Sequence, residues 1–131
     1  MSPSPKQLGE LETAVLSVLW KSTSPLSVRD VLAQLRRRPA PAYTTVLTVL
    51  DRLHDKDMVS RELQGKAFLY RARVSPEEWF GEQAARVLMS SPEATSSAVL
   101  MAFLDTAERA DPALVDRLSA LIRQRRKERG T

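Results

Sequence analysis

Four side chains in the middle of the sequence are suited to contacting nucleic acid. They are Thr44, Thr45, Thr48 and Arg52. Thr44, Thr48 and Arg52 recur every four residues, and Thr45 lies three residues before Thr48, so the four gather on one side of a helix. Short hydroxyls and an arginine suit a helix that enters a DNA groove, because they reach phosphates and base edges without bulk. A solvated helix face more often carries paired Glu and Lys, so the pattern favours nucleic-acid binding.

The chain lacks the residues that catalysis and metal binding most often need. The chain has no cysteine and one histidine, His54, which excludes disulfides, thiolate catalysis and metal sites built from Cys or several His. No motif surrounds His54, so we interpret it as a surface histidine. With 4 glycines in the chain, there is no Gly-rich phosphate loop. We therefore expect no enzyme, no cofactor and no bound metal.

The threonine-bearing segment must also have a face that packs on a core. Val46, Val49, Leu50 and Leu53 recur at helical spacing and supply that face. Two helices are expected before it. The first spans about 8–21, and Trp20 closes its apolar stripe. The second begins at the capping box of Ser27 and Asp30 and ends in Arg36, Arg37 and Arg38, which suit a helix C-terminus.

The hydrophobic period changes from helical to alternating after the third helix. Residues 58–63 and 67–74 read as two strands, and Gln64, Gly65 and Lys66 between them indicate a hairpin. Three short helices followed by a hairpin are the layout of a winged helix. The sequence thus predicts a mainly α fold with a small β-hairpin, in which 1–74 form a winged helix-turn-helix DNA-binding domain.

Residues 75–131 predict a second, helical region that ends in a basic tail. Ser75 and Pro76 begin one helix, and two more follow. About 55 residues bury too little surface to be robust alone, so their apolar stripes favour packing against a second copy. The alternative is packing against the chain's own N-terminal domain. The predicted dimerisation residues are Phe80, Val99, Leu100, Phe103, Leu104, Leu118, Leu121 and Ile122.

The distribution of charge supports a polyanion partner for the first region. Residues 1–73 hold 12 Lys and Arg against 7 Asp and Glu, whereas 74–131 hold 8 against 9. The excess of positive charge therefore lies with the threonine-bearing helix. No apolar run reaches the roughly 20 residues of a membrane span, and no signal peptide begins the chain. We expect a cytoplasmic protein, associated with the nucleoid when bound to DNA.

Four segments of the chain resemble the penicillinase-repressor (BlaI/MecI) family of bacterial winged-helix transcription repressors. They are LGELETAVLSVLW at 8–20, SVRDV at 27–31, AYTTVLTVLDRL at 42–53 and RELQGKAFLY at 61–70. The threonine-rich segment is the most specific of them. Where the family usually has Gly after the third helix, this chain has Asp57, and Asp tolerates a left-handed backbone.

The resemblance implies a homodimer that binds inverted repeats in double-stranded DNA of promoters, with TACA/TGTA-like half-sites, and blocks transcription. The third helix is the reader, so Thr44, Thr45, Thr48 and Arg52 inherit DNA contacts. We also predict that Tyr43, in the same segment, binds DNA. The hairpin is the wing, so Arg61, Gln64 and Lys66 inherit contacts to the DNA backbone.

The resemblance also suggests a way of relieving repression. Many members are cut at an Asn-Phe bond in the fifth helix under a membrane sensor of β-lactams. The aligned pair here is Ala102 and Phe103, which keeps the Phe but not the Asn. Copper-responsive relatives carry a C-terminal cysteine motif, which this chain lacks.

Two alternatives remain open from the sequence. One is a ligand-sensing regulator whose pocket is lined by Trp79, Phe80 and Phe103, although aromatic residues at helical spacing are more often core. The other is a winged-helix module that binds protein. Salt-sensitive DNA binding distinguishes a DNA reader from the protein-binding module.

Overall fold

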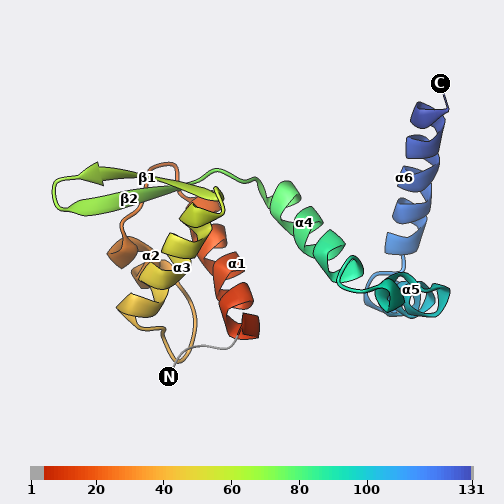
Figure 1. The fold of residues 1–131 in the computed structure, drawn as a ribbon, viewed down its shortest axis with the longest axis horizontal. Helices are drawn as coiled ribbons and strands as arrows, with labels where there is room; N and C mark the ends of the chain where they lie inside the picture. The colour runs from red at the N-terminus through yellow and green to blue at the C-terminus, as the bar shows by residue number, and fades with distance from the viewer. Residues whose placement is uncertain (1–4, 131) are drawn as a thin grey trace. The chain divides into compact units, whose positions relative to one another are not determined.

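The computed structural model describes residues 5–130 of the chain (Figure 1). The elements in chain order are α1 (Pro5–Lys21), α2 (Val28–Gln34), α3 (Tyr43–Asp55), β1 (Val59–Gln64), β2 (Ala67–Ala72), α4 (Pro76–Leu88), the 3-10 helix η1 (Pro92–Thr95), α5 (Ser97–Ala110) and α6 (Leu114–Arg129). The described part of the chain is thus mainly helical with a two-stranded hairpin, and this confirms the expected fold class.

The chain divides into two compact units between Gly81 and Glu82, within α4. We call them the N-terminal unit and the C-terminal unit. The predicted domain limits, 1–74 and 75–131, remain a proposal.

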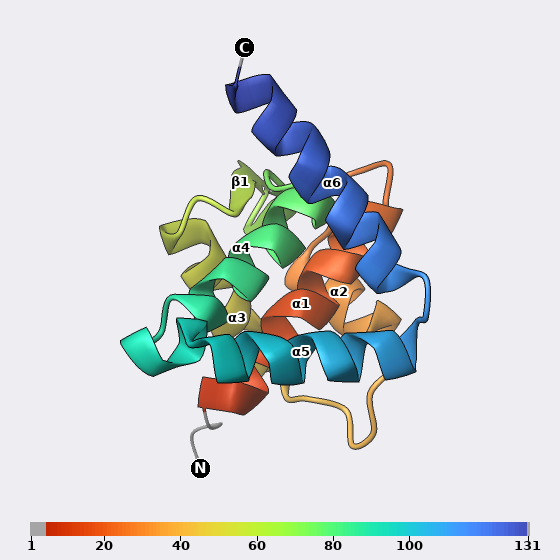
Figure 2. The same ribbon diagram turned by 90° about the vertical axis from the view of Figure 1, so that its right-hand side faces the viewer.

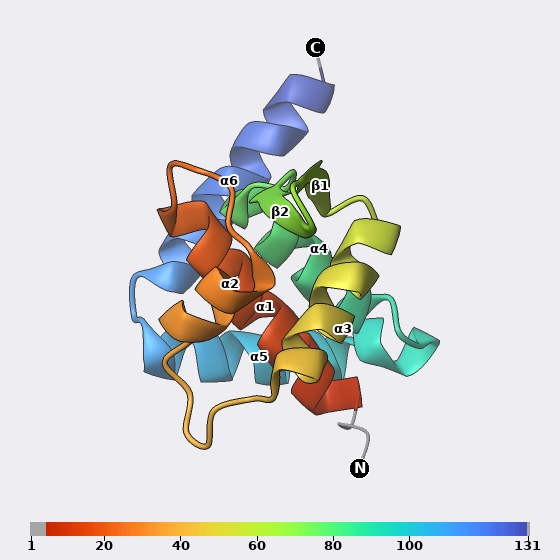
Figure 3. The ribbon, with the colours of Figure 1, turned by 90° about the vertical axis from the view of Figure 1, so that its left-hand side faces the viewer.

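The core of the N-terminal unit forms where α1, α2 and α3 pack together, with the hairpin beside them (Figure 3). Its largest fully buried side chains are Leu16, Leu50, Leu53, Tyr70 and Trp79, together with Val15, Val31, Val46, Val49 and Val59. The four apolar residues predicted for the inner face of α3 are all among them. Because this core is mostly aliphatic, it depends on close packing of helical stripes.

Three contacts tie the hairpin and the start of α4 to the helices. Leu26 and Tyr70 exchange backbone hydrogen bonds of 2.9 and 2.7 Å. The Trp20 indole N–H donates to the Val74 carbonyl at 2.7 Å, and the Trp79 indole N–H donates to the Thr13 hydroxyl at 3.0 Å. Trp79 is buried in this core, as is more often the case for aromatic residues at helical spacing.

Helix α2 begins where the sequence predicts, but its end and the start of α1 differ from the prediction. The capping box at α2 is present, with Ser27 and Asp30 exchanging side-chain and backbone hydrogen bonds of 3.1 Å. However, α2 ends at Gln34, because Leu35 adopts an extended backbone. The arginines at 36–38 therefore lie in the connection to α3 and do not cap the helix as predicted. Helix α1 begins at Pro5 rather than Leu8.

The hairpin is closed by two residues, Gly65 and Lys66, because Gln64 pairs with Ala67. Gly65 has a φ of 65°, and glycine at the first central position of a two-residue loop suits the right-handed twist of the strands. Asp57, after α3, has a φ of 62°. The left-handed turn that the sequence allowed at this position is therefore formed by an aspartate.

The C-terminal unit contains η1, α5 and α6 (Figure 2). The Ser96 hydroxyl accepts a hydrogen bond from the Val99 N–H and caps α5, and Asp111 accepts from the Ala113 N–H before α6. The basic segment at 123–129 forms the last turns of α6, so the predicted tail is part of a helix. Cations are favourable there because they face the negative end of the helix dipole.

Candidate nucleic-acid interface

Helix α3 presents the predicted reader residues on the side away from its core face. Thr44, Thr48 and Arg52 are exposed and follow one another at intervals of four residues, so they form one stripe along the helix. Thr45 is half-buried beside this stripe. Tyr43 begins the helix and is 44% exposed. The packing of Val46, Val49 and Leu50 fixes which face remains outside.

The threonine hydroxyls are not equivalent. The Thr48 hydroxyl donates to the Thr44 carbonyl at 2.9 Å, within the helix. Its proton is therefore engaged, and the side chain presents a methyl group and oxygen lone pairs. A surface of this kind suits a thymine methyl or a base amino group.

Arg52 lies at the far end of the stripe and faces a carboxylate from α1. Its Nε is 3.8 Å from an oxygen of Glu12, and the Lys56 ammonium lies 3.1 Å from the same oxygen. Glu12 is buried, whereas the Arg52 side chain is 48% exposed. One side of the Arg52 side chain thus faces Glu12, and the rest is exposed to solvent. Sequence reasoning missed Glu12, because it lies 44 residues before Lys56 in the chain.

Arg61, on β1, is engaged within the N-terminal unit. Its Nη1 donates to an Asp51 carboxylate oxygen at 3.1 Å, and its guanidinium carbon lies 4.4 Å from the centre of the Phe68 ring. These contacts join α3 to both strands of the hairpin. The other two predicted wing residues, Gln64 and Lys66, are exposed at the hairpin turn.

A cleft of about 250 Å³ lies between the starts of α2 and α3 and the tip of the hairpin. Tyr43 and Lys66 are at its edge, and Arg29 lies 5.8 Å from the centre of the Tyr43 ring. The buried Tyr70 hydroxyl has no hydrogen-bond partner among residues 5–130. Burial raises the pKa of this phenol, and the nearby Arg61 guanidinium offsets part of the rise. Arg29 gave no sequence signal, because it lies inside the capping motif of α2.

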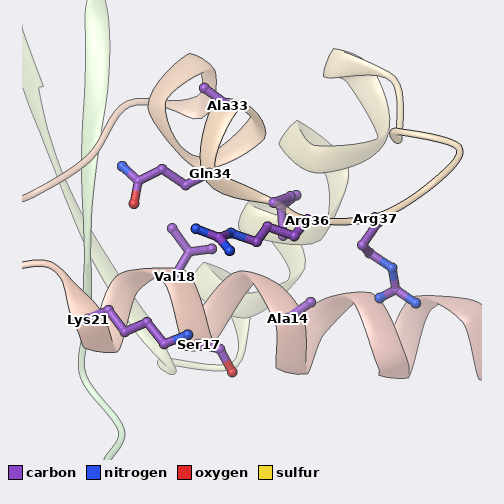
Figure 4. Close-up of a pocket in the computed structure, with 9 residues that line it drawn as sticks. Ala14, Ser17, Val18, Lys21, Ala33, Gln34, Arg36 and Arg37 are labelled. Atoms are coloured by element: carbon purple, nitrogen blue, oxygen red, sulfur yellow. The ribbon is translucent and has the colours of Figure 1, made fainter.

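A separate groove of about 680 Å³ runs between α1 and residues 33–37. Arg36 extends toward Val18 and Gln34, and Lys21 lies at one end (Figure 4). Arg37 reaches Glu10 of α1 at 3.7 Å. None of the residues that line this groove belongs to α3 or to the hairpin. The cations of the groove, Lys21, Arg36 and Arg37, are therefore separate from the exposed stripe on α3.

The C-terminal unit leaves most of its large apolar side chains exposed. Of the predicted dimerisation residues, Phe80, Val99, Leu100, Phe103, Leu121 and Ile122 are exposed, and Leu104 and Leu118 are half-buried. Phe80 belongs to the N-terminal unit, where its ring lies 6.0 Å from that of Trp20. Ala107 is the single buried residue among 82–130. Ala102, beside Phe103, is also exposed on α5.

The described residues contain no helix with the length and apolar character needed to cross a membrane. Within the same residues, no group of three His, Asp or Glu side chains is placed to hold a metal ion.

Comparison with known proteins places these features in a family. Residues 8–124 match the model of a family described as penicillinase repressor. The chain is 45% identical over 64 residues to the transcriptional regulator BlaI of Mycobacterium tuberculosis (strain ATCC 25618 / H37Rv), which is 49% of this chain and 46% of that protein. It is 22% identical over 99 residues to the penicillinase repressor of Bacillus licheniformis, covering 76% of this chain and 77% of that protein.

The chain spans about half the length of the mycobacterial relative that it matches. Among solved structures, a CopR repressor is 34% identical over 47% of this chain and 88% of that chain, with a TM-score of 0.41.

Proposed function

Because this chain belongs to the penicillinase-repressor family, we propose that it is a homodimeric transcriptional repressor that binds an inverted-repeat operator in the promoters of its target genes. The observation that carries this proposal is the exposed stripe of Thr44, Thr48 and Arg52 on α3. The stripe combines short threonine side chains with an arginine, and both kinds of group contact base edges. The opposite face of α3 packs in the core, so the helix is held rigidly with this stripe facing outward.

In this proposal α3 enters the major groove and the hairpin lies on the DNA backbone. Lys66 is at the turn of the hairpin, where its ammonium is free to reach a phosphate. Gln64 adds a neutral hydrogen-bonding group beside it. Two copies place their α3 helices about 34–36 Å apart, which is one turn of DNA, and the bound dimer occludes polymerase.

The C-terminal unit supplies the dimer contact in this proposal. Its exposed apolar residues lie on α5 and α6, and a two-fold interface buries the same surface of both copies. Leu100 and Phe103 on α5 and Leu121 on α6 are between 38% and 60% exposed. Side chains of this kind gain most from burial against a second copy, at roughly 25 cal/mol per Å² of apolar surface.

The reader assignment is tested with Arg52→Ala. A duplex selected from a random library by the wild-type protein serves as the probe, and a scrambled duplex of the same composition serves as the competitor. We expect Arg52→Ala to weaken binding to the selected duplex by about 1–3 kcal/mol, measured by fluorescence anisotropy. We also expect binding of the wild-type protein to weaken steeply with salt, because phosphate contacts release counterions.

Arg109→Ala is the matched control. Arg109 is an exposed arginine on α5, so its removal changes the net charge equally but leaves α3 untouched. A wild-type protein that selects no sequence would contradict the proposed function, and salt-insensitive association with DNA would favour a protein-binding module. Unchanged affinity of Arg52→Ala would remove Arg52 from the reader residues.

A further inference from the structure

Glu12 is a buried carboxylate beneath the reader helix. It lies on α1, its side chain is 6% exposed, and it faces the C-terminal end of α3. Lys56 contacts both carboxylate oxygens, at 3.1 and 3.2 Å. Arg52 completes the cluster, with its Nε 3.8 Å from one of these oxygens. The carboxylate is thus shared by two cations four residues apart, Arg52 in the last turn of α3 and Lys56 at its C-cap.

A buried charge must be paired, because removing it from water costs several kcal/mol unless cations or hydrogen bonds replace the lost hydration. The ion pairs that stabilise the Glu12 carboxylate also restrain the side chains of Lys56 and Arg52. An arginine carries five N–H donors. Contact through the Nε side leaves the remaining donors of Arg52 available, in keeping with its exposure of 48%.

We infer that Glu12 is a positioning residue that sets the sequence specificity of α3. It holds the Arg52 guanidinium in one orientation toward DNA, and it also cancels part of the positive charge at that end of the helix. The first effect favours discrimination between sequences, because a fixed guanidinium is selective for the geometry of its acceptors. The second effect lowers affinity for DNA of any sequence. This inference rests on the proposed function.

The two effects give a test in which two measured quantities move in opposite directions. Glu12→Gln keeps the shape of the side chain but removes its charge. We expect affinity for the scrambled duplex to rise several-fold. We expect the ratio of affinities for selected and scrambled duplexes to fall by about fivefold or more. A purely structural role for Glu12 would not raise affinity for the scrambled duplex, because partial unfolding weakens binding to both duplexes.

Glu10→Gln is the matched control. Glu10 lies on the same helix and is also ion-paired, but its partner is Arg37 rather than a residue of α3. The substitution changes the net charge equally. We expect the affinity ratio of Glu10→Gln to equal that of the wild-type protein. A ratio that falls equally in both variants would show that net charge alone is responsible, and this would overturn the inference.

A second variant covers the case in which Glu12→Gln does not fold. Glu12→Asp keeps the charge but withdraws the carboxylate by one methylene, so its contact with Arg52 lengthens. We expect a lower affinity ratio without a gain in affinity for the scrambled duplex.

If Glu12→Gln does fold, it should not change the affinity ratio further in an Arg52→Ala background. A further fall in that background would show that Glu12 acts through another residue.

The outcomes separate the inference from the proposed function. A wild-type protein that does not distinguish the two duplexes contradicts the proposed function, whatever the variants do. A wild-type protein that does distinguish them, together with unchanged ratios in Glu12→Gln and Glu12→Asp, overturns the inference alone.

Discussion

At the scale of single residues, the engaged hydroxyl of Thr48 leads to a prediction about how α3 reads DNA. The proton of this hydroxyl is bound to the Thr44 carbonyl, so the methyl group is the part of Thr48 most available to a base. We expect Thr48→Val to bind the selected duplex within about threefold of the wild-type protein. Thr48→Ser, which lacks the methyl group, should lose about 0.8 kcal/mol, the value of one buried methylene-sized group.

Anisotropy titrations of the two variants against the same duplex provide the measurement. Thr44→Ser is a useful companion, because it removes a methyl group from the same stripe. If Thr48→Val binds more weakly than Thr48→Ser, the hydroxyl itself contacts a base edge.

Tyr70 carries a second prediction at this scale. Its buried hydroxyl lacks a hydrogen-bond partner within residues 5–130, and such a group costs about 1–3 kcal/mol of desolvation. Tyr70→Phe should therefore leave the free energy of unfolding unchanged or raise it by about 1 kcal/mol, as measured by urea denaturation at pH 7. Tyr43→Phe, at an exposed tyrosine, should have little effect. A large decrease in the free energy of unfolding of Tyr70→Phe would mean that the hydroxyl makes a stabilising contact, and Arg61 is the first candidate for its partner.

The raised pKa of Tyr70 also predicts a dependence on pH. Burial raises the pKa of the folded phenol above the ordinary value of 10.0. Between the unfolded and folded pKa values, the unfolded state has lost its proton and the folded state has not. The contribution of Tyr70 to the free energy of unfolding is therefore fully present below pH 10 and decreases as the pH rises above 10. Tyr70→Phe lacks this loss, so its advantage over the wild-type protein should grow above pH 10.

At the scale of elements, Arg61 joins the hairpin to α3. Its ion pair with Asp51 and its contact with the Phe68 ring make it a connection within the domain as well as a candidate phosphate contact. Partly exposed ion pairs contribute about 0–1 kcal/mol, and cation–π contacts contribute about 0.5–1 kcal/mol. We expect Arg61→Ala to lower the free energy of unfolding by about 1 kcal/mol.

A double-mutant cycle with Asp51→Ala tests this connection directly. The coupling energy should be about 0.5–1 kcal/mol. Arg71→Ala, at an exposed arginine on β2, should change stability by less than about 0.5 kcal/mol. Additive effects of Arg61→Ala and Asp51→Ala would show that the ion pair does not hold the hairpin.

At the scale of the whole molecule, the exposed apolar side chains of the C-terminal unit predict self-association. Leu121→Glu places a charge in the proposed interface, and burying an unpaired charge there is unfavourable. Because Leu121 is 60% exposed in a single chain, the substitution should not disturb the folding of one copy. We expect a dimer for the wild-type protein and a monomer for Leu121→Glu, measured by light scattering.

Arg123→Glu is the control for this prediction, because it introduces the same carboxylate on α6 about 200° around the helix from residue 121. It should remain dimeric. A dimer that survives Leu121→Glu, and also Leu118→Glu, would place the interface elsewhere. Loss of the dimer should also weaken DNA binding, since one α3 then contacts one half-site.

Local sequence encodes the features of this chain that depend on near neighbours. The two faces of α3, the capping box of Ser27, the turn at Gly65 and the left-handed Asp57 each follow from residues within a few positions of one another. Helical and alternating periods, caps and turn residues act over one or two turns of backbone. For this reason the fold class was predictable, and so was the exposed face of α3.

Tertiary packing sets how residues far apart in the sequence are paired. It buried Glu12 under Arg52 and Lys56, engaged Arg61 with Asp51, and placed Trp79 in the core. It also ended α2 before the arginines at 36–38. No local pattern encodes these contacts, because each depends on which helix faces meet once the aliphatic core is packed. The same packing decided which cations beside α3 are restrained by carboxylates and which remain exposed.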